Sequence, residues 1–218
     1  MEEKVVIITG ASSGIGEACV YDYLKKGHKV VMAARNEQKL NDIKSKVSKN
    51  GQEVLAIPTD VSKEEDCKNL IDQTIKHYGK IDILINNAGI SMRALFKDIE
   101  TDVIKKLMDV NFWGTVYCSK YALPYLIEQN GSLVGVSSIA GFQGLPGRTG
   151  YSSSKFAMHG FLETLRIENL KKGLHVMIAA PGFTSTNVRK SALGPDGSEQ
   201  GESPRDENHM MSPAKVAS

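Results

Sequence analysis

The stretch that decides the fold of this chain is Val5-Val6-Ile7-Ile8-Thr9-Gly10-Ala11-Ser12-Ser13-Gly14-Ile15-Gly16. Its first part is a short apolar run rich in β-branched residues, which predicts a buried strand. The glycines that follow allow a tight turn and let a pyrophosphate approach the backbone N–H groups at the N-terminus of the next helix. Their positions, 10, 14 and 16, depart from the common G-x-G-x-x-G spacing. The stretch therefore predicts a strand, a phosphate-binding turn and a helix.

Similar apolar runs alternate with segments of helical periodicity along the chain, which is typical of βαβ units around a parallel sheet. Strands are expected at residues 4–9, 29–34, 53–57, 81–85, 132–137 and 174–180. Right-handed crossovers then give an α/β fold, a Rossmann-like doubly wound parallel sheet with strand order 3-2-1-4-5-6. Its ligand crevice lies beyond the carboxyl ends of the strands, where the order reverses between strands 1 and 4.

Two of the intervening helices carry clear signals. One has apolar residues at helical spacing, Leu40, Ile43 and Val47. For the other, Ser62 with Glu65 predicts a capping box at its start, and Gly79 predicts its end after Tyr78. These helices supply crossovers between parallel strands.

The length and net charge of the chain limit its domain organisation and its classes of partner. A chain of 218 residues is long enough for one domain, expected at 1–218, and its net charge of +2 offers no electrostatic footprint for nucleic acid or an anionic membrane. Small molecules are the expected partners. The five histidines show no metal-ligand spacing, so no metal is expected. Cys19, Cys67 and Cys118 suit reduced thiols, and the N-terminus lacks a signal-like segment, so the cytoplasm is the expected location.

A second constellation points to proton transfer. Ser138 precedes Tyr151 by thirteen residues, and Lys155 follows it by four, one helical turn on. A phenol normally titrates near 10, and a neighbouring ammonium is expected to lower its pKa. Tyr21 and Lys25 repeat the spacing without a serine, and they are interpreted as a solvated helix face. Ser137 competes with Ser138 for the hydroxyl role.

The ordered set of motifs resembles the short-chain dehydrogenase/reductase family over nearly the whole chain. Its nucleotide turn reads T-G-x-x-x-G-x-G, as residues 9–16 do here. Further matches follow in order: Asp60-Val61, Asn86-Asn87-Ala88-Gly89, Asn111, Ser138, Tyr151 with Lys155, and Pro181-Gly182. The resemblance implies an NAD(P)-dependent oxidoreductase that acts on alcohols and carbonyl compounds, with a homodimer or homotetramer as the possible assembly.

The resemblance also implies roles. Tyr151 is the general acid and base, Ser138, at the family's offset, steadies the substrate oxygen, and Lys155 bonds the nicotinamide ribose. Asn111 holds a water that connects Lys155 to solvent. The cofactor contacts implied are Gly10, Ser12, Ser13, Gly14, Ile15, Gly16, Arg35, Asp60, Val61, Asn87, Ala88, Gly89, Tyr151, Lys155, Pro181, Gly182, Thr184 and Thr186. Asp60 meets the adenine, and Asn86 braces strand 4.

The end of strand 2 bears on the choice of dinucleotide. An acidic residue there would grip the ribose 2′-hydroxyl of NAD, whereas this chain has Ala33-Ala34-Arg35-Asn36. A guanidinium suits a 2′-phosphate, so NADP(H) is favoured over NAD(H). The alternative is that Arg35 only covers the surface.

The substrate end of the site is less well marked. Phe142, Leu145 and Phe183 are candidates for an apolar substrate pocket, with Met92 and Arg93 at its far side. Glycines recur at 141, 144, 147 and 150, which indicates a mobile loop beside the site.

The C-terminal part departs from the family. Residues 194–208 are rich in Gly, Pro and charge, so residues 190–218 are expected to form a flexible lid or tail. Ser212-Pro213 signals a helix with little room to form. The family's seventh strand is missing, which leaves strand 6 as an open edge. Because of this short C-terminus, a nucleotide-binding relative with little or no turnover is the alternative to an active enzyme.

Overall fold

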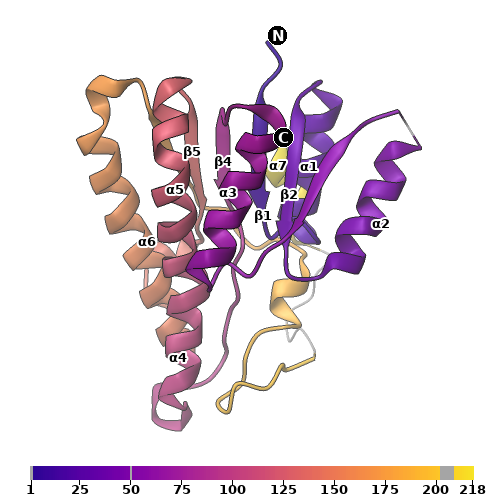
Figure 1. Ribbon diagram of the computed structural model, residues 1–218. Coiled ribbons are helices and arrows are strands. Elements are labelled where there is room, and N and C mark those ends of the chain that lie inside the picture. Colours follow the sequence, from indigo (N-terminus) through magenta and orange to yellow (C-terminus); the bar gives the residue numbers. More distant parts are fainter. Residues whose placement is uncertain (1, 50, 202–208) are drawn as a thin grey trace.

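The computed structural model describes residues 2–49, 51–201 and 209–218, which form a parallel sheet between two layers of helices (Figure 1). The six strands run in the order β3-β2-β1-β4-β5-β6, which confirms the predicted doubly wound topology. They are β1 (Val5–Thr9), β2 (Lys29–Ala34), β3 (Val54–Pro58), β4 (Ile83–Asn86), β5 (Ser132–Val136) and β6 (His175–Ala179). Among the described residues no seventh strand pairs with β6.

The helices are α1 (Gly14–Lys25), α2 (Glu37–Ser48), α3 (Glu64–Tyr78), α4 (Thr101–Met108), α5 (Gly114–Glu128), α6 (Thr149–Glu168) and α7 (Pro213–Ala217). Short turns of helix lie at η1 (Phe96–Asp98), η2 (Asp109–Trp113), η3 (Ile139–Gly141), η4 (Leu170–Lys172) and η5 (Asn187–Arg189). The turn η2 is a π-helix between α4 and α5. In the described part of the chain, no helix is both long and apolar enough to cross a lipid bilayer.

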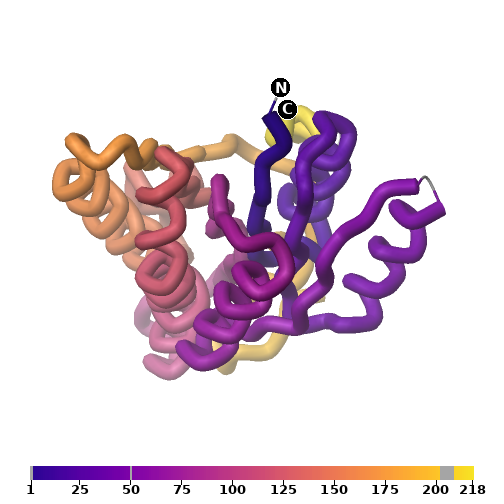
Figure 2. The backbone as a smooth tube through the Cα atoms, turned by 45° about the horizontal axis from the view of Figure 1, so that its top comes forward, coloured from indigo at the N-terminus to yellow at the C-terminus, as the bar shows by residue number. Residues whose placement is uncertain are grey.

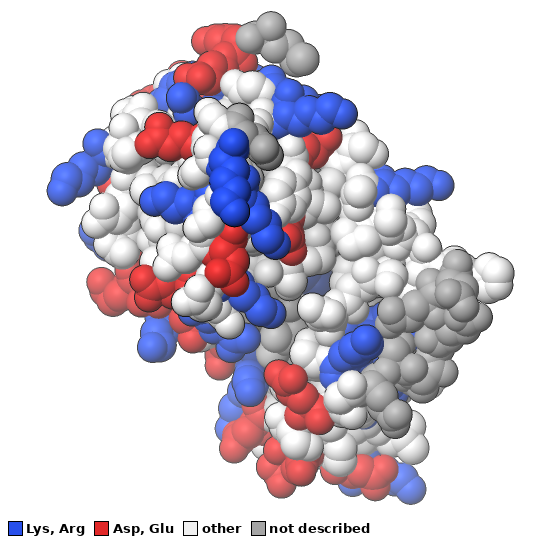
Figure 3. Space-filling view, turned by 90° about the vertical axis from the view of Figure 1, so that its right-hand side faces the viewer, with Lys and Arg blue, Asp and Glu red and all other residues white. Residues whose placement is uncertain are grey.

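The core has two layers because successive residues of a buried strand point to opposite faces of the sheet. Val5 and Ile7 of β1 pack with apolar residues of α3, α5 and α6. Val6 and Ile8 pack on the other face with α1 and α2. Cys19, Cys67 and Cys118 are free and buried in these two layers. On the face that carries α2, acidic and basic side chains are interspersed (Figure 3).

One local prediction about a helix start differs from the structure. Helix α3 begins at Glu64 after Lys63, so the predicted capping box of Ser62 and Glu65 is wrong. The Ser62 hydroxyl instead donates to Asp60 Oδ1 (2.7 Å), because the turn offers it a closer acceptor. The predicted end at Gly79 is confirmed, since Gly79 adopts a left-handed conformation with φ of 74°.

The C-terminal residues pack more closely than their composition suggests. Helix α7 forms despite its five residues and lies against α1, capped by the Ser212 hydroxyl, which accepts from Lys215 N (Figure 2). Ala192 and Leu193 are buried, and Leu193 N donates to Ser91 O (2.8 Å). A flexible lid over 190–218 stays a prediction, and its residues 202–208 lie outside the described ones. The single-domain assignment also stays a prediction.

Candidate active site

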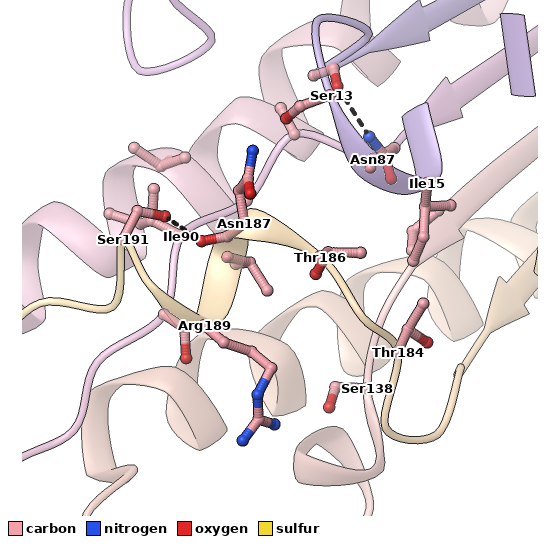
Figure 4. Close-up of a pocket in the computed structure, with 18 of the residues that line it drawn as sticks. Ser13, Ile15, Asn87, Ile90, Ser138, Thr184, Thr186, Asn187, Arg189 and Ser191 are labelled. Atoms are coloured by element: carbon pink, nitrogen blue, oxygen red, sulfur yellow. Dashed lines mark hydrogen bonds between the residues drawn. The ribbon is translucent and has the colours of Figure 1, made fainter. Parts of the chain in front are cut away.

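A cavity of about 1020 Å³ opens at the carboxyl ends of the strands, where the strand order reverses between β1 and β4. Figure 4 shows part of its lining, with Ser13 and Ile15 of the glycine-rich turn on one side and Ser138 and Thr184 on the other. All the predicted cofactor contacts line it except Gly16, and so do Ser138, Tyr151 and Lys155. Neither Gly16 nor Asn111 is a lining residue.

The glycine-rich turn is held by the loop that follows β4. Asn87 Nδ2 donates to Thr9 O (2.9 Å) and Gly10 O (3.3 Å). A Cβ on Gly16 would lie 2.5 Å from Asn87 Nδ2 and still closer to Gly10 O. Gly16 therefore serves close packing of the turn, whereas Gly10 and Gly14 adopt φ of 65° and 60°, which glycine tolerates best.

The N-terminus of α1 suits a phosphate group. Among the described residues, the N-cap Ser13 makes no side-chain capping bond. The first N–H groups of a helix have no intrahelical partner, and together with the helix dipole they attract an anion. The residues present therefore fit the pyrophosphate of a dinucleotide.

Asp60 and Arg35, which are predicted to contact the adenosine half of the cofactor, both line the cavity, and Asp60 has a structural role as well. Asp60 Oδ1 accepts hydrogen bonds from Ser62 N (3.1 Å) and from the Ser62 hydroxyl, which orders the turn before α3. Arg35 is exposed after β2 and lines the cavity together with Lys39, a cation that sequence reasoning missed. Lys39 lies in the first turn of α2, and a basic residue within a helical pattern carries no signal of its own.

Burial dominates the electrostatics of the catalytic candidates. It raises the pKa of the Tyr151 phenol, while the Ser138 hydroxyl and the Arg148 charge act in the opposite direction. Lys155 is 3% exposed, and burial lowers its pKa to about 8. Its Nζ donates to Val136 O (2.9 Å) and lies 5.9 Å from the centre of the Tyr151 ring. The expected lowering of the Tyr151 pKa by Lys155 is therefore wrong for this structure, since burial outweighs the Ser138 hydrogen bond and the Arg148 charge.

Gly89 leaves the approach to Lys155 open. A Cβ there would lie 3.2 Å from Asn111 Oδ1 and 3.5 Å from Lys155 Nζ. Glycine at this position thus lets a ligand come close to both groups, which fits the nicotinamide ribose of a dinucleotide.

Asn111 lies fully buried in the π-helix η2, beside the cavity. Its Oδ1 accepts from Ile90 N (2.8 Å), and its Nδ2 donates to Ile90 O (3.0 Å) and to Ser154 Oγ (2.9 Å). Ser154 in turn donates to Tyr151 O (2.8 Å). The side chain of Asn111 therefore braces the segment after β4 against the helix that carries Tyr151. The water that it was expected to hold stays a prediction.

The two neighbouring serines after β5 have different surroundings. Ser137 is buried, and its hydroxyl lies 2.6 Å from His159 Nε2. Ser138 lines the cavity and caps η3, with its Oγ accepting from Ala140 N (3.3 Å). This arrangement favours Ser138 for contact with a substrate. Asn86, as expected, braces β4 by donating to Ser119 Oγ (3.2 Å).

The candidate substrate pocket differs in part from the expectation. Leu145 and Phe183 line the cavity, but Phe142, Met92 and Arg93 do not. Phe142 packs edge-on against His159, and Met92 is fully buried. Sequence reasoning missed the polar lining residues, which include Ser91, Arg148, Asn187, Arg189, Lys190, Ser191 and Glu199.

Tyr21 and Lys25, which repeat the Tyr–Lys spacing, do not line the cavity. Tyr21 is exposed on α1, and its hydroxyl donates to Glu17 Oε1 (3.3 Å). Lys25 is exposed at the end of the same helix. The two residues form a solvated helix face, as the sequence indicated.

The fold and the cavity together define a nucleotide-binding α/β protein of the Rossmann class. A sequence profile described as short chain dehydrogenase matches residues 4–195. The chain therefore belongs to the short-chain dehydrogenase family, whose members use NAD(P).

Two curated relatives are similar to most of the chain. It is 44% identical over 187 residues to 11-beta-hydroxysteroid dehydrogenase-like 2 of Arabidopsis thaliana, covering 85% of this chain and 60% of that protein. It is also 44% identical over 192 residues to 11-beta-hydroxysteroid dehydrogenase of Pinus massoniana, covering 87% of this chain and 54% of that protein. The chain thus spans between half and two thirds of the length of these relatives.

Solved structures are similar over more of their length. An alcohol dehydrogenase from the archaeon Thermococcus sibiricus, complexed with 5-hydroxy-NADP, has a TM-score of 0.88 at 26% identity, covering 99% of this chain and 88% of that chain. A short chain dehydrogenase/reductase from Burkholderia phymatum, in complex with NAD, has a TM-score of 0.83 at 28% identity, covering 86% of this chain and 68% of that chain.

Proposed function

We propose that this protein is an NADP(H)-dependent oxidoreductase that acts on a carbonyl compound or secondary alcohol, with Tyr151 as general acid and base. The observation that carries the proposal is that Ser138, Tyr151 and Lys155 line the same cavity as the glycine-rich turn. When bound, the dinucleotide supplies or accepts the hydride at the carbonyl carbon.

The chain's own residues handle the proton. Tyr151 donates its phenolic proton to the carbonyl oxygen, and the Ser138 hydroxyl donates a hydrogen bond to the same oxygen. The raised pKa keeps Tyr151 protonated at neutral pH, which is the form that carbonyl reduction needs. Lys155, with a pKa of about 8, is charged at neutral pH and gives up a proton readily above it. It is therefore suited to return a proton toward Tyr151.

The proposal is tested by following NADPH and NADH oxidation against a panel of aldehydes and ketones. Tyr151→Phe should lower kcat by about 10²-fold or more, because it removes the proton donor and little volume. Equal rates in the two proteins would contradict the mechanism. A nucleotide-binding protein with little turnover is the outcome if the wild type binds a dinucleotide in a thermal-shift assay but reduces no carbonyl.

The preference for NADP(H) rests on Arg35 and Lys39, two cations beside the expected position of the ribose. A 2′-phosphate paired with one of them gains a charge-assisted hydrogen bond that NAD lacks. Arg35→Ala should therefore lower the ratio of NADPH to NADH affinity about tenfold. Lys44→Ala is the matched control, since Lys44 is an exposed lysine of α2 that does not line the cavity. A preference for NADH in the wild type would refute the argument.

A further inference from the structure

Arg148 is a partly buried charge near Tyr151, and the proposed mechanism does not use it. It lies three residues before Tyr151, at the start of α6, and both side chains line the cavity. Burial is the main cause that lowers the pKa of Arg148, and the neighbouring Arg93 and Arg189 act in the same direction. The positive form of Arg148 is therefore destabilised where it stands.

The bonds that Arg148 makes do not offset this cost with a negative charge. Its Nη1 donates to Ser91 Oγ (2.6 Å) and to Met92 O, which are both neutral. Among the described residues no carboxylate forms an ion pair with Arg148. A charge that is partly withdrawn from water and lacks a counter-charge is costly, and such charges are usually paired or bind a ligand.

Arg93, whose charge acts on Arg148, has only part of its hydrogen-bonding capacity used by described residues. Its Nη1 donates to Gln200 Oε1 (3.0 Å), and Gln200 Nε2 donates back to Arg93 O (2.7 Å). Its Nη2 is buried and has no hydrogen-bond partner in the part of the chain that the structure describes. Gln200 thus fixes the position of a second guanidinium near the first, again without a negative charge.

The cavity wall around this point is also basic. Figure 4 shows Arg189 extending from η5 toward Ser138, and Lys190 follows it in the lining. The described lining residues include two acids, Asp60 at the adenosine end and Glu199. Glu199 forms no ion pair with a described residue. Basic side chains therefore outnumber acidic ones where a substrate would meet Tyr151.

We propose that Arg148 binds an anionic oxygen group of the substrate, a carboxylate or a phosphate, while Tyr151 handles the carbonyl. This inference rests on the proposed function and specifies its substrate class. A guanidinium matches either anion with two parallel N–H···O bonds. Arg148 and Tyr151 line the same cavity, three residues apart at the start of α6, so one small substrate can reach both side chains. The substrate is therefore an oxo acid or a phosphorylated ketone.

The test compares anionic ketones with neutral partners of similar shape. The probes are straight-chain oxo acids with their methyl esters, and hydroxyacetone phosphate with hydroxyacetone. Wild type should favour the anionic member of one pair about tenfold or more in kcat/KM, mainly through KM, because a charge-assisted hydrogen bond is lost in the neutral partner. The pair that responds distinguishes a carboxylate from a phosphate.

Arg148→Met should reduce this preference by about tenfold. Arg148→Lys keeps the charge but loses the forked geometry of the guanidinium, so its preference should lie between those of the wild type and Arg148→Met. Lys171→Met removes an exposed positive charge in η4 and should leave the ratio unchanged. A wild type that favours the neutral partners, or a preference that survives Arg148→Met, would overturn the inference.

Calorimetric titration of the same probes onto the NADP⁺-saturated protein separates this inference from the proposed function. Tighter binding of the anion, lost in Arg148→Met, supports the anion site even where turnover is absent. Equal binding of the anionic and neutral probes to the wild type overturns it. Reduction of neutral ketones alone would leave the proposed function standing and refute the anion site.

Discussion

Lys155 is a buried charge whose removal should make the protein more stable at pH 7. The side chain is 3% exposed, and burial lowers its pKa from 10.5 to about 8. A folded state that holds the protonated lysine out of water carries a penalty that the unfolded chain does not. Methionine has a similar length and no charge, so Lys155→Met relieves the penalty without opening a large cavity.

The magnitude follows from the difference between the two pKa values. A lowering from 10.5 to about 8 corresponds to roughly 3 kcal/mol at about 1.4 kcal/mol for each tenfold change in acidity. The variant loses the bond from Lys155 Nζ to Val136 O, which contributes about 1 kcal/mol. The free energy of unfolding of Lys155→Met should therefore exceed that of the wild type by about 2 kcal/mol at pH 7.

The pH dependence isolates the charge from the packing. Below pH 8 the lysine is protonated in both the folded and the unfolded states, and the penalty is fully present. Between pH 8 and 10.5 the folded protein releases the proton while the unfolded chain keeps it, so wild-type stability rises relative to the variant. From pH 7 to pH 9.5 the difference between the two proteins should shrink by about 2 kcal/mol.

The assay is urea denaturation of both proteins, freed of nucleotide, at several pH values in this range. Lys171→Met serves as the control, because an exposed lysine should shift stability little at any of them. Two results would refute the reasoning: a variant that is less stable than the wild type at pH 7, or curves against pH that run parallel. The first would mean that the bond to Val136 outweighs the charge, and the second that Lys155 titrates at its usual pKa when folded.

Other predictions concern the glycine-rich turn and the paired serines. Gly16→Ala should destabilise the fold by about 1–3 kcal/mol in urea denaturation, because its Cβ would meet backbone. Gly160 lies on α6 with space for a Cβ, so Gly160→Ala should instead stabilise the fold by about 0.5–1 kcal/mol. Equal changes in the free energy of unfolding of the two variants would contradict the packing argument. Ser138→Ala should lower kcat about 10²-fold. Ser137→Ala should mainly lower the free energy of unfolding, by about 1 kcal/mol, because it removes the bond to His159. If Ser137→Ala lowered kcat and Ser138→Ala lowered only stability, the two serines would have exchanged roles.

Much of the fold is predictable from short stretches of sequence. The apolar runs and the turn of residues 5–16 specify a strand, a tight turn and a helix through local sterics and periodicity. Right-handed crossovers then leave few arrangements of the strands, and the observed order follows. The predicted start of α3 was wrong because the Ser62 hydroxyl can either cap the helix or bond Asp60, and in the structure it donates to Asp60 Oδ1.

Some features of the candidate site are likewise predictable from sequence spacing, and others depend on the tertiary structure. Spacing alone indicates Tyr151 and Lys155 as a pair on one helix face, because four residues make about one turn. Local spacing does not report burial, which raises the pKa of Tyr151 instead of lowering it. Nor does it reveal Ser154, which lies 43 residues after Asn111 and joins it to Tyr151. The local sequence pattern thus predicts the type of chemistry. The desolvation of the site and the positive charge gathered around Arg148 arise only when distant segments pack together and exclude water.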